Sequence, residues 1–225
     1  MRKTKSIIQG IAAPLPESDI DTDAILPAQF LLLLEKKGMG KYLFHERRKP
    51  GATPRFVLDA PEYHGAKIIV GGPKFGIGSS REHAVWALAD FGIECVIAPS
   101  FGDIFYANCF KNGVLPIALD DSQHAELMIA ANRATEFIVN IEWRELSYGQ
   151  KKSVSFDLDG RRQRAFLEGL DEIEQVRAED GHSIRAFEKT HRIAAPWLHL
   201  SKQQLCTFEN VEANNGNDVT GKASA

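Results

Sequence analysis

The central part of the chain alternates short apolar runs with longer segments that have the apolar spacing of helices. Glycines support this division, because Gly92 and Gly113 stand where a helix commonly ends. The expected strands cover residues 67–72, 94–98 and 114–119, and the expected helices cover residues 80–91 and 103–112. This β-α-β-α-β order predicts a largely parallel sheet and places the chain in the α/β class.

The flanking segments add further elements to this centre. Strands are expected at residues 7–13, 137–141 and 153–159, and helices at residues 122–133, 161–168 and 181–190. Residues 29–34 are apolar, which predicts burial or contact with a partner, and residues 36–54, rich in Gly, Lys, Arg and Pro, predict a long surface loop. We expect one domain over residues 1–206, with a core at about 5–190, an extension at 191–206 and a disordered tail at 207–225.

Charge and cysteine content exclude several classes of protein. The 27 Lys and Arg residues nearly balance the 30 Asp and Glu residues, which argues against a nucleic-acid partner. No apolar run approaches the roughly 18 residues of a membrane span, so no membrane partner is expected. Cys95, Cys109 and Cys206 lie far apart in the sequence, which fits a reducing, cytoplasmic location and provides no metal site in this chain.

The segment from Phe75 to His83, Phe-Gly-Ile-Gly-Ser-Ser-Arg-Glu-His, has the chemistry of an anion site. Its two glycines allow a sharp turn after a strand, and Ser79 and Glu82 have the spacing of a capping box at a helix start. A helix amino terminus together with Arg81 favours a carboxylate or a phosphate. The phosphate-loop and dinucleotide fingerprints are both incomplete, which argues against a nucleotide. A purely structural turn, with Arg81 paired to a surface acid, is an open alternative at this point.

Several segments, in the same order, resemble one enzyme family. Residues 75–83 resemble the Ser-Ser-Arg signature of the small swivelling domain of the aconitase superfamily, and residues 21–27, Asp-Thr-Asp-Ala-Ile-Leu-Pro, resemble a motif of isopropylmalate isomerase small subunits. Residues 98–105 and 161–171 are similar to two further segments of these subunits. The resemblance covers about residues 5–190 and implies a three-layer β/β/α swivelling domain of the aconitase type.

The resemblance also implies an activity, which is a hydro-lyase reaction in leucine biosynthesis. Such enzymes remove water from a 2-hydroxy acid and add it back at the neighbouring carbon. An iron–sulfur (4Fe–4S) cluster on a large subunit is implied as the Lewis acid, so this chain would bind no cofactor and would act only with that partner. Carried onto this sequence, Ser79 is the implied catalytic base, Ser80 and Arg81 are implied ligands of a substrate carboxylate, and Asp23 is implied to organise the site.

Leu32 bears on the substrate, because it stands in our alignment where relatives acting on tricarboxylic acids place an arginine. An apolar residue there favours an alkyl-substituted diacid such as isopropylmalate, with ordinary core packing of Leu32 as the alternative. Glu82, His83 and Asp103 are interpreted as structural. Departures from the family pattern such as Ile77 leave open a sister hydratase of citramalate or a dimethylmalate, and a non-catalytic carboxylate-binding module is the alternative outside catalysis.

Overall fold

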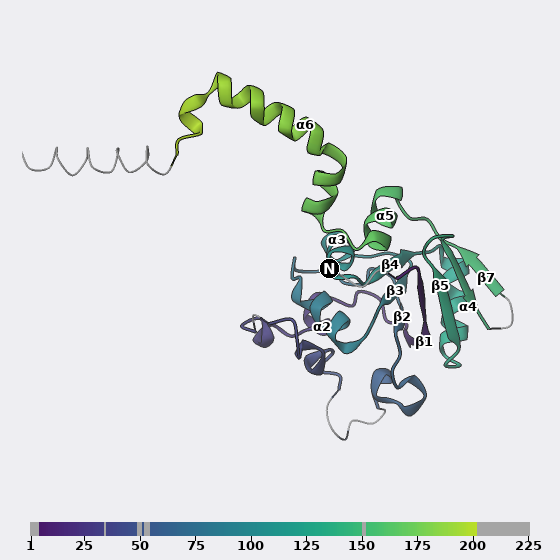
Figure 1. Ribbon diagram of the computed structural model, residues 1–225. Coiled ribbons are helices and arrows are strands. Elements are labelled where there is room, and N and C mark those ends of the chain that lie inside the picture. Colours follow the sequence, from purple (N-terminus) through teal and green to yellow (C-terminus); the bar gives the residue numbers. More distant parts are fainter. Residues whose placement is uncertain (1–4, 34, 49–50, 52–54, 150–151, 202–225) are drawn as a thin grey trace, which may run out of the picture. The chain divides into compact units, whose positions relative to one another are not determined.

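The computed structural model describes residues 5–33, 35–48, 51, 55–149 and 152–201 of the 225-residue chain (Figure 1). The chain divides into two compact units, Met1–Glu172 and Ile173–Ala225. The tail expected over residues 207–225 lies outside the described residues. The expectation of a single domain over residues 1–206 therefore stays a prediction.

Within the described part of the first unit, seven strands form one mixed sheet (Figure 1). The strands are β1 Ile7–Leu15, β2 Ile68–Gly71, β3 Cys95–Ala98, β4 Leu115–Ala118, β5 Glu136–Asn140, β6 Glu145–Tyr148 and β7 Lys152–Ser155. Their order across the sheet is β4-β3-β2-β1-β5-β6-β7. Strands β1 to β4 are parallel to one another, whereas β5, β6 and β7 each run antiparallel to the strand before them in that order. The α/β class and the parallel centre are thus confirmed, and the other half of the sheet is antiparallel.

Separate apolar cores cover the two faces of the sheet. Strands β2 and β3 are buried along their whole length, as expected for parallel strands with both faces covered. Because side chains alternate along a strand, Ile69 and Val96 belong to one core, and Ile68 and Ile97 belong to the other. Helices α2 His83–Phe91 and α3 Asp103–Asn112 contribute to the first core, and helices α4 Asp121–Ala131 and α5 Gly160–Glu168 contribute to the second.

The segment 36–54 was predicted as a long surface loop, but part of its described residues is buried, so this prediction is wrong there, and residues 49, 50 and 52–54 lie outside the described residues. Their 3-10 helix η2, Met39–Tyr42, packs beside α2, and Phe44 is fully buried. The approach is close at Gly40, where an added Cβ would lie 2.5 Å from the backbone nitrogen of Phe91. Glycines and lysines separate the apolar residues of this segment, so the sequence shows no helical or strand periodicity here. The apolar residues are buried because they pack against α2, which lies far along the chain.

The other element boundaries agree with the sequence expectations in part. Helix α3 covers residues 103–112 as predicted. The strand expected at 153–159 ends at Ser155, and β6 was not predicted because its four residues are too few to give a clear alternation. The remaining helical segments of the first unit are α1 Thr22–Ile25, η1 Ala28–Phe30, η3 Val57–Asp59 and η4 Pro61–Tyr63.

Helix α6, Glu172–Ala194, makes up most of the described part of the second unit and is longer than the expected helix at 181–190. The short 3-10 helix η5, Pro196–Leu198, follows it. Helix α6 has no buried residue, and charged side chains recur along it. Among the described residues, no helix is both long enough and apolar enough to cross a membrane.

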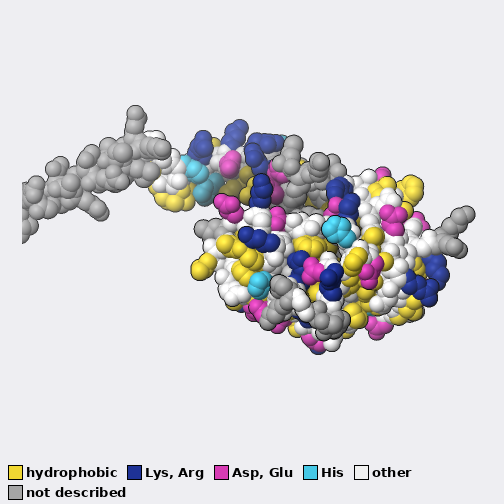
Figure 2. Space-filling model, turned by 90° about the horizontal axis from the view of Figure 1, so that it is seen from below, with side chains coloured by type: hydrophobic (Ala, Val, Ile, Leu, Met, Phe, Trp, Pro, Cys, Tyr) yellow, Lys and Arg dark blue, Asp and Glu magenta, His cyan; other side chains and the backbone are white. Residues whose placement is uncertain are grey.

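Figure 2 shows a face of the molecule on which basic and acidic side chains are interspersed. Ion pairs such as Arg48–Asp59, with 2.7 Å between nitrogen and oxygen, join side chains of opposite sign in the first unit. A continuous basic stripe, as a nucleic-acid partner requires, is not seen on the face drawn.

Candidate functional site

The glycine-rich turn that follows β2 is held by two other segments of the first unit. One segment follows β3, and the other leads from β1 into α1. Four backbone hydrogen bonds make these links, from Phe75 N to Ser100 O (3.0 Å), Gly102 N to Phe75 O (3.0 Å), Gly76 N to Ile20 O (2.7 Å) and Thr22 N to Ile77 O (2.9 Å). The motifs at residues 21–27, 75–83 and 98–105 are far apart in the sequence. They meet beyond the carboxyl ends of the parallel strands β1, β2 and β3.

Glycine is required at two positions of this junction. Gly76 has a φ of 74°, and an added Cβ would lie 2.2 Å from the Phe105 ring. At Gly102 an added Cβ would lie 2.6 Å from the carbonyl oxygen of Gly76. Side chains at either position would separate the segments, because Gly76 packs against the Phe105 ring and Gly102 against the backbone of Gly76. The positive φ of Gly76 confirms the expected sharp turn after the strand.

Thr22 anchors the backbone of the turn at Ser79. The backbone nitrogen of Ser79 donates to Thr22 Oγ1 at 3.2 Å, and this hydroxyl lies 3.4 Å from the carbonyl oxygen of Ser79, to which it donates. Thr22 is only 1% exposed, whereas Ser79 and Ser80 are exposed. The backbone that carries the serines is thus fixed while their side chains face solvent. The sequence reasoning missed Thr22, although a hydroxyl residue between two acids in the 21–27 motif was a signal for it.

Arg81 and Asp23 form an ion pair across the junction. Nη1 of Arg81 donates to Oδ1 of Asp23, which lies in the first turn of α1. Helix α1 is itself capped by Asp21, whose Oδ1 accepts from the backbone nitrogen of Ala24 at 2.6 Å. A guanidinium has five N–H donors, so Arg81 retains donors for a bound carboxylate beside Asp23. Two predicted site residues, 58 positions apart in the sequence, are therefore in direct contact.

The predicted capping box of Ser79 and Glu82 is wrong, and so is a helix start at residue 80. Helix α2 begins at His83, and no side chain caps it from Glu82, its N-cap residue. The Glu82 carboxylate instead accepts from Trp86 Nε1 at 3.1 Å and from Asn112 Nδ2 at 2.7 Å. The backbone nitrogen of Ser79 is already bonded to Thr22, so tertiary contacts replace the local cap.

Ionisation of Glu82 is favoured by this environment. Burial raises the pKa of this carboxyl, but the hydrogen bonds from Asn112 and Trp86 and the charges of Lys36 and Lys111 outweigh that effect, so the pKa lies below its ordinary value. The two other residues interpreted as structural take local positions. The His83 ring packs against that of Trp86 with 4.4 Å between centroids, and Asp103 is the first residue of α3.

Leu32 lies on an exposed loop after η1. Leu32 is 90% exposed, which rules out core packing of this residue. The 29–34 stretch is therefore not buried along its whole length. The loop begins at Phe30, whose ring stacks on that of Tyr42 with 4.1 Å between centroids. Residue 34 lies outside the described residues. Leu32 is thus available to a ligand or a partner, on the segment that follows α1 and Asp23.

The cysteines do not fit an iron–sulfur cluster in the described part of this chain. Cys95 and Cys109 are fully buried, and burial raises the pKa of both thiols, which opposes the thiolate form that iron requires. Among the described residues there is no group of three or more His, Cys, Asp or Glu side chains arranged to hold a metal ion. Cys206 lies outside the described residues.

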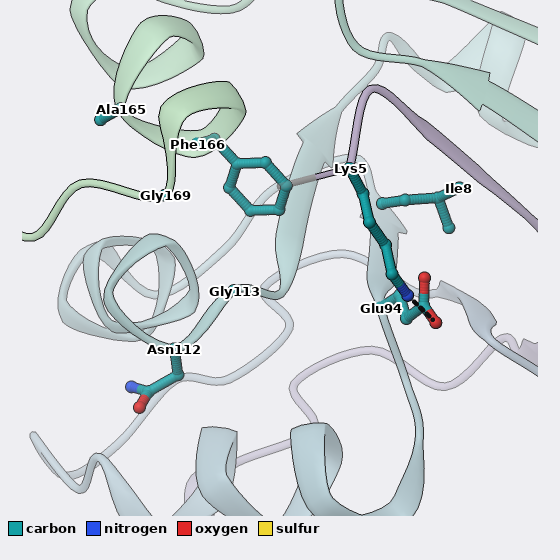
Figure 3. A pocket seen from close by; sticks show the side chains of 8 residues that line it. All are labelled: Lys5, Ile8, Glu94, Asn112, Gly113, Ala165, Phe166 and Gly169. Carbon is teal, nitrogen blue, oxygen red and sulfur yellow. Dashed lines mark hydrogen bonds and ion pairs between the residues drawn. The ribbon is translucent and has the colours of Figure 1, made fainter. Parts of the chain in front are cut away.

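A separate pocket of about 180 Å³ opens between the start of β1, the end of α3 and helix α5 (Figure 3). The Lys5 side chain extends along it to Glu94, with 2.7 Å between nitrogen and oxygen, and the Phe166 ring faces it. The described residues that line this pocket include none of the predicted site residues.

Comparison with known proteins identifies relatives along most of the chain. Residues 3–122 match the family of aconitase C-terminal domains. The 3-isopropylmalate dehydratase small subunit of Paramagnetospirillum magneticum is 49% identical over 197 residues, covering 85% of this chain and 97% of that protein. That of Rhizobium etli is 47% identical over 195 residues, covering 84% and 96%. A solved structure of 3-isopropylmalate dehydratase from Methanocaldococcus jannaschii superposes with a TM-score of 0.60 and 26% identity, covering 80% of this chain and 99% of that chain. The expected aconitase-type swivelling fold is thereby confirmed.

Proposed function

Because this chain belongs to the family of 3-isopropylmalate dehydratase small subunits, we propose that it is the small subunit of a hydro-lyase interconverting 2- and 3-isopropylmalate in leucine biosynthesis. The observation that carries the proposal is the junction at which Asp23 and Arg81 pair beside the exposed Ser79. This geometry suits a small diacid, since it offers a permanent cation next to a hydroxyl on a fixed backbone.

Arg81 and Ser80 bind a substrate carboxylate in this proposal. A guanidinium binds a carboxylate through two parallel N–H bonds, and its contact with Asp23 fixes the plane in which those donors lie. Ser80 follows the anchored Ser79 and is exposed, so its hydroxyl is available for a further hydrogen bond to the same carboxylate.

Ser79 acts as the base, with its Oγ taking the proton from the substrate carbon. An alkoxide needs strong stabilisation, which Arg81 provides in part and water would weaken. Ser79 and Ser80 are exposed in the chain alone, so exclusion of water depends on docking of the large subunit over the turn. The isolated chain is therefore expected to be inactive.

The large subunit is proposed to carry the iron–sulfur cluster, whose Lewis acidity toward the substrate hydroxyl complements the base on this chain. The two buried cysteines and the donor set of the described residues do not fit such a cluster here. Free buried thiols at Cys95 and Cys109 suit a reducing compartment, and we propose that the complex works in the cytoplasm.

The substrate is proposed to carry an alkyl group that meets Leu32. Its side chain is exposed in the chain alone, and covering it with an alkyl substituent would remove apolar surface from water. An additional substrate carboxylate at that place would lose its hydration without gaining a partner from Leu32. This favours isopropylmalate over a tricarboxylic acid.

Anaerobic reconstitution with a cluster-loaded large subunit tests the proposal. We expect conversion of 2- to 3-isopropylmalate only with both chains, and its loss in Ser79→Ala, with Glu126→Ala as a control on the far side of the sheet. Conversion of citramalate or a dimethylmalate in place of isopropylmalate would identify a sister hydratase. Absence of turnover of any diacid, with tight diacid binding by the isolated chain, would instead establish a non-catalytic binding module.

A further inference from the structure

The Glu82 carboxylate joins helices α2 and α3 of the first unit. It precedes α2 directly, it accepts from Asn112 Nδ2 at the end of α3 (2.7 Å), and it accepts from Trp86 Nε1 within α2 (3.1 Å). Lys36, on the loop after Leu32, completes the cluster. Its Nζ lies 2.9 Å from Asn112 Oδ1, 3.9 Å from Glu82 Oε1 and 4.8 Å from the centroid of the Trp86 ring.

This cluster lies next to the substrate-binding turn without being part of it. Glu82 follows Arg81 in the chain, so fixing the Glu82 side chain fixes the backbone from which Arg81 extends. Thr22 holds the other side of the turn at Ser79. Besides the backbone bonds at residues 75–77, the turn is thus held at Ser79 by Thr22 and at Glu82 by Asn112 and Trp86, and the Glu82 attachment is adjacent to Arg81.

The cluster also connects the two halves of substrate recognition. Lys36 is four residues after Leu32, whose loop is fixed at its start by the stacking of Phe30 on Tyr42. At its other end the loop is held by the contacts of Lys36 with Asn112, Glu82 and Trp86. The charge of Lys36 is one of the causes that lower the pKa of Glu82, in agreement with the 3.9 Å between their charged groups.

We infer that Glu82 is a positioning residue, which sets the direction of Arg81 through the backbone and, through Lys36 and Asn112, holds the loop that carries Leu32. The inference rests on the proposed function, because it requires Arg81 to bind the substrate carboxylate. The inference assigns different roles to the two attachments of the turn. The attachment at Glu82 affects substrate binding by Arg81, and the attachment at Thr22 affects the position of the base Ser79.

The test is steady-state kinetics of the reconstituted enzyme with isopropylmalate. We expect Glu82→Ala to raise KM about tenfold, because it removes both hydrogen bonds that hold the backbone next to Arg81. We expect kcat to fall less than about threefold, because Ser79 stays attached to Thr22. Glu82→Gln retains an acceptor for Trp86 and Asn112 and is expected to restore KM to within about threefold of wild type. The KM of the double variant Glu82→Ala/Asn112→Ala is expected not to exceed that of the poorer single variant, because both substitutions remove the same Glu82–Asn112 hydrogen bond.

Glu126→Ala is the matched control for general destabilisation. Glu126 also accepts two side-chain hydrogen bonds, from Tyr148 at 3.0 Å and Lys152 at 3.1 Å, but it lies on α4. An equal rise of KM in Glu82→Ala and Glu126→Ala, or additive effects of Glu82→Ala and Asn112→Ala, would overturn the inference. If Glu82→Ala does not fold, Asn112→Ala gives the same KM comparison from the other side of the bond.

Failure of the inference and failure of the proposed function give different results. If Ser79→Ala and Arg81→Lys leave activity unchanged, the assignment of the site itself is wrong. If both abolish activity while KM is unaffected by Glu82→Ala, the site stands and only the positioning role of Glu82 is refuted.

Discussion

Replacing Thr22 with valine removes the hydroxyl that fixes Ser79 and changes little else in shape. Thr22 is buried, and its Oγ1 lies 3.2 Å from the backbone nitrogen and 3.4 Å from the carbonyl oxygen of Ser79. Leaving that partly buried N–H without its partner costs about 1–2 kcal/mol of unfolding free energy. For a unit of this size, such a loss lowers Tm by about 2–8 °C.

The catalytic effect of Thr22→Val is expected to exceed the effect on stability. Without the hydroxyl, the Ser79 backbone moves relative to a substrate bound at Arg81, and a displacement of about 1 Å can reduce a rate by up to about a hundredfold. We therefore expect kcat of the reconstituted enzyme to fall at least about tenfold, with KM changed less than about threefold. Thermal denaturation followed by circular dichroism gives Tm for the same preparations.

Thr22→Ser separates the two effects. Serine keeps the hydroxyl and loses a buried methyl group, which costs about 1 kcal/mol, so its loss of stability is similar to that of Thr22→Val. Its kcat is expected to stay within about threefold of wild type, because the bond to Ser79 is kept. Equal kcat values for the valine and serine variants would refute the idea that this hydroxyl positions the base.

Two further predictions concern stability. Gly76→Ala is expected to lower the free energy of unfolding by about 2–4 kcal/mol in urea titrations, because the new Cβ meets the Phe105 ring at a φ of 74°. The control Gly65→Ala is also at positive φ but has open space around it, so it is expected to cost only about 1 kcal/mol. Equal losses in the two variants would contradict the steric explanation. Glu82 has a folded-state pKa below its ordinary value of 4.5, so its contribution to stability is present above that pH and is lost as the pH falls through the folded pKa. Relative to Glu82→Gln, wild-type protein is therefore expected to lose Tm on acidification below about pH 4.5, and parallel Tm curves for the two proteins would show that the carboxylate charge contributes nothing.

The elements that could be predicted from sequence are those whose signals are local. Helix α3 begins at Asp103 and ends before Gly113, and both signals are adjacent to the helix ends that they mark. The buried strands β2 and β3 are continuous apolar runs, which need no partner to be recognised. The contact between Asp23 and Arg81 was not predicted, because no local pattern links the two residues and the family resemblance only assigned both of them to one site.

The error at the glycine-rich motif has a physical origin in competition from distant segments. Ser79 and Glu82 have the spacing of a capping box, yet Ser79 is bonded to Thr22, and Glu82 to Asn112. Both partners are tens of residues away in the sequence, so no window around the turn contains the information that displaces the cap. Local propensity therefore gives the wrong start for this helix, while the chemistry assigned to the motif stays a prediction.

The ion pair between Arg81 and Asp23 is better explained by orientation than by stability. Asp23 is 52% exposed and Arg81 is 21% exposed, and pairs in such surroundings contribute about 0–1 kcal/mol to folding. Docking of a large subunit over the turn would remove water from both groups and strengthen their attraction, together with the attraction of Arg81 for a bound carboxylate. The energetic value of the pair would then arise mainly in the assembled enzyme, where the direction of the guanidinium decides how substrate is held. The fixed backbone and exposed side chains of the turn agree with the proposed division, in which this chain would supply the geometry and the large subunit the dry environment.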